Sequence, residues 1–162
     1  MRIRLVVLAL LAMLAGGVVV PGAAPAEEEE LLALTRALLE HIYVTPDAEF
    51  YAAHVAAEVT AYEGPPTRVD GLDFHLFALR QLARQLAEAR VQGEERYLDL
   101  LNPRVQLYGD AAIVTATSRV TVIGGDNPRM DLLNETRVWA RRAGGWKLVH
   151  FHKSPVVWPQ EN

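Results

Sequence analysis

The sequence predicts a single α+β domain in which helices cover one face of an antiparallel sheet. Three observations predict this fold class: stripes of leucines at helical spacing come first, long segments with alternating side chains come last, and turns rich in glycine join those segments. Helices followed by a run of strands are typical of α+β domains. Because we find no internal repeat and no linker within residues 27–154, one domain accounts for that range.

Residues 1–26 have the pattern of a secretory signal peptide. Arg2 and Arg4 supply positive charge, an apolar run follows, and small residues at 24–26 offer a cleavage site. An uncleaved membrane anchor is the alternative, but an apolar run of about 16 residues is shorter than the ~20 that span the hydrocarbon core of a bilayer. We therefore expect an exported protein, periplasmic or secreted, that makes no membrane contact after cleavage.

The composition excludes several classes of partner and site. The chain has 16 lysines and arginines against 20 acidic residues, and loss of Arg2 and Arg4 would make it more acidic still. Nucleic acids and anionic membranes select basic surfaces, so neither is an expected partner. Cysteine is absent, which excludes disulfides and any metal site or nucleophile based on cysteine. The sequence also lacks a phosphate-binding glycine loop and an HExxH motif.

The first half of the domain predicts three helices and one strand. The first helix is expected over 27–41, and Thr45 is expected to cap a short second helix that has Pro46 in its first position. A strand is expected over 59–63, and the longest helix over 70–89. The buried stripe of this longest helix is expected to consist of Leu72, Leu76, Leu79, Leu82 and Leu86.

The second half of the domain predicts four strands. The first two are expected over 97–108 and 112–123, with a bulge at Asn102 and Pro103. The last two form a hairpin within 135–154, whose turn is made of Ala143, Gly144 and Gly145. With the single strand of the first half, these segments predict one antiparallel sheet.

Basic residues interrupt the apolar faces of these strands. On the last strand, alternation places Val149, Phe151 and Lys153 on one face and Leu148, His150 and His152 on the other. Arg119 and Arg137 also lie in the middle of strands. Neither face of the strand over 112–123 is strongly polar. We therefore expect helices to cover one face of the sheet and a second subunit to cover the other, which predicts a homodimer.

Three blocks of sequence resemble a known family. They are VDGLDFHLF (69–77), LLNPRVQLYGDAAIV (100–114) and ETRVWARRAGGWKLVHFHKS (135–154). In this order they are similar to the association, or hub, domain of calcium/calmodulin-dependent protein kinase II, within the nuclear-transport-factor-like and SnoaL-like superfamily. The resemblance leaves out residues 1–26 and the tail 155–162, so we expect a free-standing, exported bacterial relative of the hub without kinase activity.

The resemblance implies a cone-shaped domain, with a long helix and shorter helices packed on the concave face of a bent antiparallel sheet. It also implies dimers formed through the convex face and larger rings of such dimers. The family's pocket is lined by three basic strand residues. The resemblance places Arg119 and Arg137 at two of these positions and Lys153 in place of an arginine at the third. His75 matches a further pocket residue, and Ala83 stands where the family has a tryptophan.

Three interpretations of these cations stay open. On the residues alone, they are surface or interface cations paired with acids such as Glu63, Glu135 or Asp131. With the resemblance, they converge with His75 and Tyr62 on a small organic carboxylate, because converging cations repel one another and a guanidinium matches a carboxylate at two points. In the third, the protein is a scaffold in which Glu63 or Glu135 neutralises the cations and the pocket stays empty.

His75 leaves a choice between structure and catalysis. It is either a core histidine bonded to backbone or to Tyr62, or the acid/base group of an enzyme similar to the isomerases and dehydratases of the superfamily. In the enzyme, Tyr62 or Glu63 would be its partner. His150 and His152 share a strand face without a third ligand at a suggestive spacing, so we expect no metal and no other cofactor. Our leading hypothesis is a non-enzymatic, self-associating domain that binds a small anion.

Overall fold

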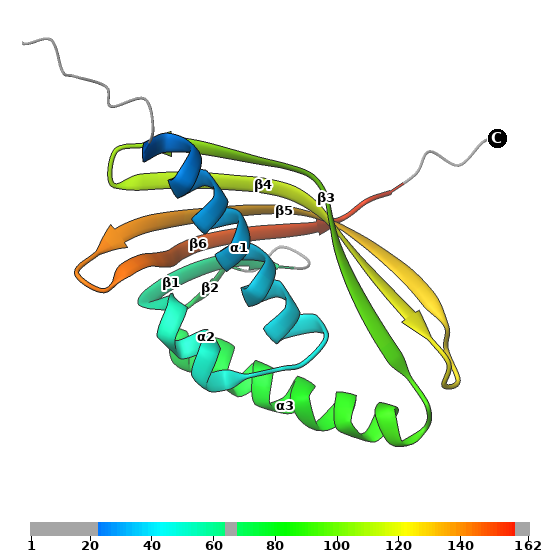
Figure 1. Ribbon diagram of the computed structural model, residues 1–162. Helices are drawn as coiled ribbons and strands as arrows, with labels where there is room; N and C mark the ends of the chain where they lie inside the picture. Colours follow the sequence, from blue (N-terminus) through cyan, green and yellow to red (C-terminus); the bar gives the residue numbers. More distant parts are fainter. Residues whose placement is uncertain (1–22, 64–67, 158–162) are drawn as a thin grey trace, which may run out of the picture.

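The structure, a computed structural model, describes residues 23–63 and 68–157 (Figure 1). In these residues three helices accompany a six-stranded sheet, which confirms the α+β fold class. The helices are α1 (Ala23–Tyr43), α2 (Ala48–His54) and α3 (Leu72–Val91). The strands are β1 (Val55–Glu63), β2 (Arg68–Asp70), β3 (Glu95–Tyr108), β4 (Ala111–Ile123), β5 (Arg129–Arg142) and β6 (Gly145–Pro155).

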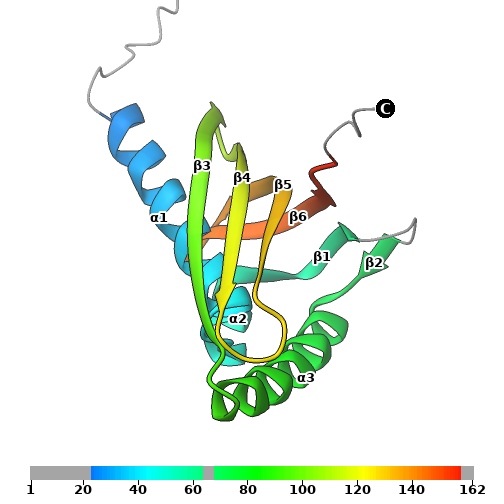
Figure 2. The ribbon, with the colours of Figure 1, turned by 90° about the vertical axis from the view of Figure 1, so that its right-hand side faces the viewer.

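The strands form one bent sheet in the order β2-β1-β6-β5-β4-β3. Strands β1 and β6 run parallel, whereas every other pair in the described residues is antiparallel. The sheet is therefore mixed rather than wholly antiparallel, because the single strand of the first half lies beside the last strand of the chain. Strand β2 was not predicted, since three residues are too few to show alternation. In Figure 2, strands β3, β4 and β5 reach toward α3.

Helix α1 crosses one face of the sheet, which we call the concave face (Figure 1). Leu31 and Leu38 of α1 are fully buried and belong to the same core cluster as Trp139 of β5. Full burial of one leucine side chain stabilises a fold by about 1.5–3 kcal/mol. These contacts fix the C-terminal end of α1, where Ile42 and Tyr43 meet the candidate site.

Most of the predicted signal peptide, residues 1–22, lies outside the described residues. Helix α1 begins at Ala23, so its first residues belong to the predicted 1–26 segment. Glu27, the first residue after the predicted cleavage point, accepts a hydrogen bond of 2.7 Å from Arg141 of β5. None of the described helices combines the length and the apolar character that a membrane crossing requires.

Helix α2 begins differently from the prediction. Its N-cap is Asp47, whose carboxylate accepts hydrogen bonds from the backbone N–H groups of Glu49 and Phe50 at 2.9 and 3.0 Å. Thr45 is not the cap, because its own N–H donates to the carbonyl of Glu40 and so ends α1. A carboxylate at the N-cap both satisfies free backbone donors and lies at the positive end of the helix dipole. The cap therefore fixes where α2 starts below the candidate site.

Two bulges decide which side chains reach the core. The predicted bulge in β3 is confirmed: the register shifts between Leu101 and Arg104, and Asn102 has a positive φ of 49°. The second bulge lies in β6. The consecutive β5 residues Val138 and Trp139 pair with His150 and Leu148, so Val149 is an extra residue without a partner on β5.

The β6 bulge corrects the predicted faces of that strand. Leu148 is fully buried and Phe151 is 4% exposed, whereas Val149 is only partly buried. Because the extra residue shifts the alternation by one, Leu148 rather than Val149 shares the core face with Phe151 and Lys153. The bulge thus directs Lys153 to the concave side of the sheet, next to α1 and α3.

Candidate ligand site

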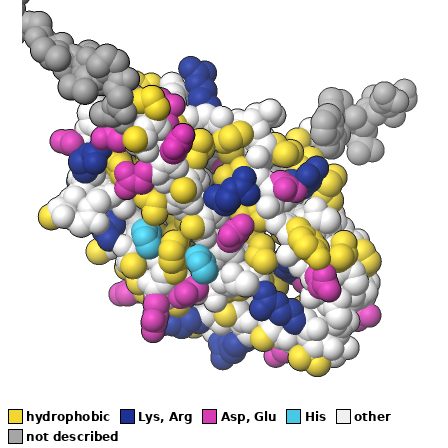
Figure 3. Space-filling model, viewed as in Figure 1, with side chains coloured by type: hydrophobic (Ala, Val, Ile, Leu, Met, Phe, Trp, Pro, Cys, Tyr) yellow, Lys and Arg dark blue, Asp and Glu magenta, His cyan; other side chains and the backbone are white. Residues whose placement is uncertain are grey.

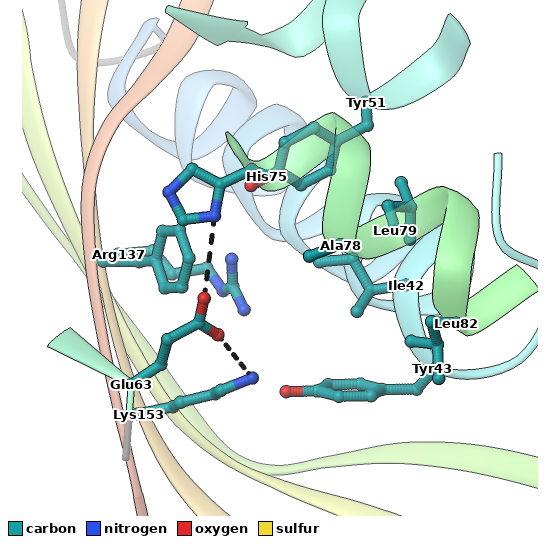
Figure 4. A pocket seen from close by; sticks show the side chains of 11 residues that line it. Ile42, Tyr43, Tyr51, Glu63, His75, Ala78, Leu79, Leu82, Arg137 and Lys153 are labelled. Carbon is teal, nitrogen blue, oxygen red and sulfur yellow. Dashed lines mark ion pairs between the residues drawn. The ribbon is translucent and has the colours of Figure 1, made fainter. Parts of the chain in front are cut away.

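A cavity of about 130 Å³ lies between the concave face of the sheet and the three helices (Figure 4). Its charged side chains come from three strands, its histidine from α3 and its tyrosines from α1 and α2, and its apolar wall comes mainly from α1 and α3. The lining residues are Ile42, Tyr43, Tyr51, Glu63, His75, Ala78, Leu79, Leu82, Arg137, Phe151 and Lys153. The residues predicted for the buried stripe of α3 thus include two of this wall, Leu79 and Leu82.

Arg137 of β5 lies almost wholly inside the protein, with 1% of its surface exposed. Its Nη2 donates a hydrogen bond of 2.9 Å to Oε2 of Glu135, and its guanidinium carbon lies 5.2 Å from the centre of the Phe151 ring. Its Nε and Nη1 groups have no hydrogen-bond partner in the part of the chain that the structure describes. Buried donors that lack a partner destabilise a fold, and a ligand that accepts from them recovers that free energy.

Glu135 is the anion that keeps Arg137 in the interior. The carboxylate of Glu135 is 3% exposed and accepts from Ser118 Oγ at 3.0 Å and from the Tyr43 hydroxyl at 3.4 Å, besides Arg137. Burial raises the pKa of Tyr43, and the neighbouring charge of Glu135 raises that pKa further. Tyr43 therefore stays a neutral hydrogen-bond donor to Glu135.

Glu63, at the end of β1, joins two further side chains of the cavity. Its Oε2 lies 2.6 Å from Nζ of Lys153, and its Oε1 lies 3.6 Å from Nδ1 of His75. Figure 4 shows both contacts and the Tyr43 hydroxyl pointing toward Lys153. The side chains of Glu63 and Lys153 are partly exposed, so this pair faces the open side of the cavity, whereas the pair of Arg137 and Glu135 is sealed.

His75 lies on α3 with 5% of its surface exposed, and no described residue forms a hydrogen bond with its Nε2. Burial lowers the pKa of His75 below the ordinary value of 6.5, the negative charge of Glu63 partly opposes this, and Lys153 adds to the lowering. The imidazole is therefore neutral at neutral pH. The backbone does not occupy its nitrogens, and a second titrating group lies beside it. The enzyme interpretation requires a second titrating group within hydrogen-bond reach of His75 and an open route to solvent, and the carboxylate of Glu63, 3.6 Å from Nδ1, lies just outside that reach.

The structure does not bring Arg119 and Tyr62 to the cavity. Arg119 lies on the opposite face of β4 from Ser118, and its guanidinium pairs with Asp99 at 2.7 Å while 40% of the side chain is exposed. Tyr62 is 46% exposed and lies on the other face of β1 from Glu63, with its ring beside His150. The prediction that three cations converge on one pocket is thus wrong for Arg119. Of the three, Arg137 and Lys153 line the cavity.

Two tyrosines of the cavity were not predicted. Tyr43 lies beyond the predicted end of the first helix, and Tyr51 belongs to α2. Tyr51 is 3% exposed, and burial raises its pKa to about 12. The only signal for Tyr43 in the sequence was its spacing from Leu39. If the first helix is extended through Tyr43, this residue lies one turn after Leu39.

Among the described residues, no group of three or more histidine, aspartate or glutamate side chains is placed to hold a metal ion. His150 and His152 lie on the face away from the cavity, where Nδ1 of His150 is 2.7 Å from the Thr60 hydroxyl. On the molecular face shown in Figure 3, acidic and basic side chains are interspersed.

The cavity combines an apolar wall with paired charges and free donors. Within it, Arg137 and Lys153 are each matched by one glutamate, so the charges nearly cancel. Among the described residues, the free donors that line the cavity are Nε and Nη1 of Arg137. Such a site suits a compact molecule that has an apolar body and strong acceptor oxygens.

Comparison with known proteins identifies the family of this chain. The model of the calcium/calmodulin dependent protein kinase II association domain matches residues 27–157. Over 133 residues, 80% of this chain, the sequence is 33% identical to the delta subunit of calcium/calmodulin-dependent protein kinase type II of Oryctolagus cuniculus. The chain spans about a quarter of the length of that relative, since the match covers 24% of it.

Solved structures agree with this match. The CaMKII hub of S. rosetta has a TM-score of 0.65 and 31% identity, over 79% of this chain and 95% of that one. A protein of the NTF2-like family from Streptomyces avermitilis has a TM-score of 0.66 over 83% of this chain and 99% of that one, and at 23% identity it shows the fold alone. The resemblance found in the sequence is thus confirmed, and the chain belongs to the calcium/calmodulin-dependent protein kinase II association-domain family, within the NTF2-like fold.

Proposed function

We propose that this protein is an exported, self-associating domain whose cavity binds a compact organic carboxylate. One observation carries the ligand part: a buried arginine, Arg137, presents donors at Nε and Nη1 that no group of residues 23–63 and 68–157 accepts. Hydrogen bonds from a guanidinium to a carboxylate are about twice as strong as bonds between neutral groups. A carboxylate at this point would satisfy those donors without removing Glu135 from Arg137.

The size of the cavity limits the ligand. A volume of about 130 Å³ is close to that of the 150 Å³ cavity that holds benzene in another protein. The apolar body of the ligand therefore has on the order of six non-hydrogen atoms. Leu79, Leu82 and Phe151 would enclose this body, while its carboxylate meets Arg137.

Self-association follows from the family, whose members are described as association or hub domains. The outer face of β4 supports this proposal, because Ile113, Thr115 and Thr117 alternate there with few charges. A sheet face of this composition is suited to contact a second copy. A homodimer through this face is the smallest assembly, and a larger ring is the further expectation.

Native mass spectrometry of the full chain expressed with its first 26 residues tests assembly and export together. The expected spectrum shows dimers or higher multiples of a chain that begins at Glu27. A monomer at micromolar concentration would contradict self-association. An intact N-terminus on protein recovered from the cell envelope would contradict export with cleavage.

Titration calorimetry with butanoate and benzoate tests the ligand. In Arg137→Lys the charge beside Glu135 remains but the guanidinium donors are lost, so binding should weaken at least about tenfold, or 1.4 kcal/mol. Arg119→Gln is the matched control, because Arg119 lies on the other face of the sheet, and its affinity should equal that of the wild type. Equal binding by the Arg137 variant would contradict the proposal. No binding by any of the proteins would favour a scaffold whose internal glutamates already neutralise the cations.

A further inference from the structure

Two histidines of β6, His150 and His152, have no part in the proposed carboxylate site. They lie on either side of Phe151, on the outer face of the sheet, which is the face away from the cavity. Nδ1 of His150 is 2.7 Å from the hydroxyl of Thr60 on β1, and His152 is exposed. Among residues 23–63 and 68–157, no acid or further histidine completes a metal site with them. We call them the outer histidine pair.

The side chains that flank the outer histidine pair on the neighbouring strands are all uncharged. On β5 they are Val138 and Thr136, and on β1 they are Thr60 and Tyr62. The edge of the Tyr62 ring faces the imidazole of His150, with 6.0 Å between the ring centres. A proton on either histidine would therefore place a positive charge among neutral neighbours.

The carboxylates of the outer face are already bonded to other groups. The charged side chains on this face, together with their ion-pair partners, are Lys147, Arg104, Arg142 with Glu58, Arg119 with Asp99, Arg68 with Asp70, and Glu95. Lys147 donates to the carbonyl of Ala53, and Glu95 accepts from Tyr97. None of the ion pairs found within the described residues includes the outer histidine pair. A charge on these histidines thus has no anion to pair with.

A second copy bound to the outer face of β4 would also cover the outer histidine pair. Stable interfaces bury about 800 Å² on each partner, which corresponds to a disc about 16 Å in radius. Strand β6 is separated from β4 only by β5 (Figure 1). Since neighbouring strands are about 4.8 Å apart, β6 lies about 10 Å from β4. The pair consequently falls within an interface centred on β4.

Such burial couples association to the uptake of protons. Burial without an anion disfavours the charged form of an imidazole, whereas an exposed imidazole on a separate chain takes a proton freely. The dimer therefore binds fewer protons than two separate chains, and its stability falls as the pH falls. Histidine is the side chain whose charge ordinarily changes between pH 5 and pH 8.

We propose that the outer histidine pair makes self-association sensitive to pH, so that copies associate through the outer face at neutral pH and separate when these imidazoles take up protons in mild acid. The inference rests on the proposed self-association and deepens it by naming what controls the contact. It does not depend on the cavity or on its ligand.

Sedimentation equilibrium of the protein between pH 7.5 and pH 5.5 measures the dissociation constant of the dimer. For ordinary histidines, each proton that the dimer excludes raises this constant about tenfold over that range. A dimer holds two outer histidine pairs, so the expected rise lies between about 100-fold, for two excluded protons, and about 10,000-fold, for four.

Three variants assign the response to these residues. In His150→Gln/His152→Gln the face carries no group that titrates in this range, so the dissociation constant should change less than about threefold. His152→Arg carries a permanent charge and should associate weakly already at pH 7.5. The matched control is His41→Gln/His54→Gln, whose histidines lie on α1 and α2, and it should keep the full response of the wild type.

Acid also acts on the fold itself, through His75. Burial lowers the pKa of His75 and Glu63 only partly opposes this, so the folded chain loses stability as the pH falls below the ordinary value of 6.5. This loss is common to the wild type and the variants. Far-UV circular dichroism of each sample identifies the pH range in which the chains stay folded, and the dissociation constants are compared within that range.

The result separates the pH response from self-association. Association that weakens in acid in the wild type but not in His150→Gln/His152→Gln supports the inference. A dimer with the same dissociation constant at both pH values overturns the inference and leaves self-association intact. A response that the double variant retains overturns the assignment to the outer histidine pair. A protein that is monomeric at every pH overturns both this inference and the proposed self-association.

Discussion

Arg119 and Arg137 occupy similar places on neighbouring strands and have opposite environments. Both lie in the middle of a long strand, and both are paired with an acidic side chain at less than 3 Å. Arg119 is 40% exposed on the outer face, whereas Arg137 is 1% exposed on the concave face and keeps unpartnered donors. The face of the sheet, rather than the residue type or its ion pair, therefore decides whether an arginine is available to a ligand.

Lys153 lies between these two extremes. Its ammonium pairs with Glu63 at 2.6 Å, and both side chains remain about a quarter exposed at the open side of the cavity. Solvent screens such a pair more than it screens the sealed pair of Arg137 and Glu135. The three cations therefore form a series of decreasing burial, which mutations can test.

The largest effect is expected for Arg137→Met. The substitution leaves the carboxylate of Glu135 buried without its cation, and breaking a buried pair in this way costs about 3–5 kcal/mol. The free energy of unfolding in urea measures the loss. The double variant Arg137→Met/Glu135→Gln should recover part of it, since no buried charge is left unpaired. A single variant as stable as the wild type would contradict the sealed pair.

A smaller effect is expected for Lys153→Met. Glu63 loses its strongest partner, but water reaches its carboxylate, so the free energy of unfolding should fall by about 1 kcal/mol. Urea unfolding under the same conditions as for Arg137→Met makes the two values comparable. A loss as large as that of Arg137→Met would show that the cavity is closed to solvent at Lys153.

The smallest effect is expected for Arg119→Gln. The ion pair with Asp99 is half-exposed, and such pairs contribute little, so stability should change by no more than about 0.5 kcal/mol. The same urea measurement tests this value and also qualifies the variant as a control for binding. A large loss of stability in a sample shown to be monomeric would contradict the exposed position of Arg119.

The elements with strong periodic signals were predictable from the sequence. The leucine stripe of α3 and the bulge at Asn102 and Pro103 both have local causes, a helical period and a residue pair that interrupts a strand. The bulge at Val149 has no such signal, because neither glycine nor proline marks it. The alternation therefore placed Val149 on the core face of β6, where the structure has Leu148.

The candidate site was only partly predictable. Alternation had already separated Arg119 from Ser118, but both faces of β4 are mainly apolar or weakly polar, so the sequence alone did not indicate which face meets the helices. The family resemblance then assigned Arg119 to the pocket. The same resemblance placed Arg137, Lys153 and His75 where the structure has them.

The most direct test of the central claim is the ¹⁵N–¹H NMR signal of the Arg137 side chain during titration with butanoate. We expect the Nε–H resonance, assigned by its absence in Arg137→Lys, to move progressively and reach a plateau while that of Arg119 stays in place. An Arg137 resonance that does not move in the folded protein at saturating butanoate would contradict a carboxylate site at this arginine.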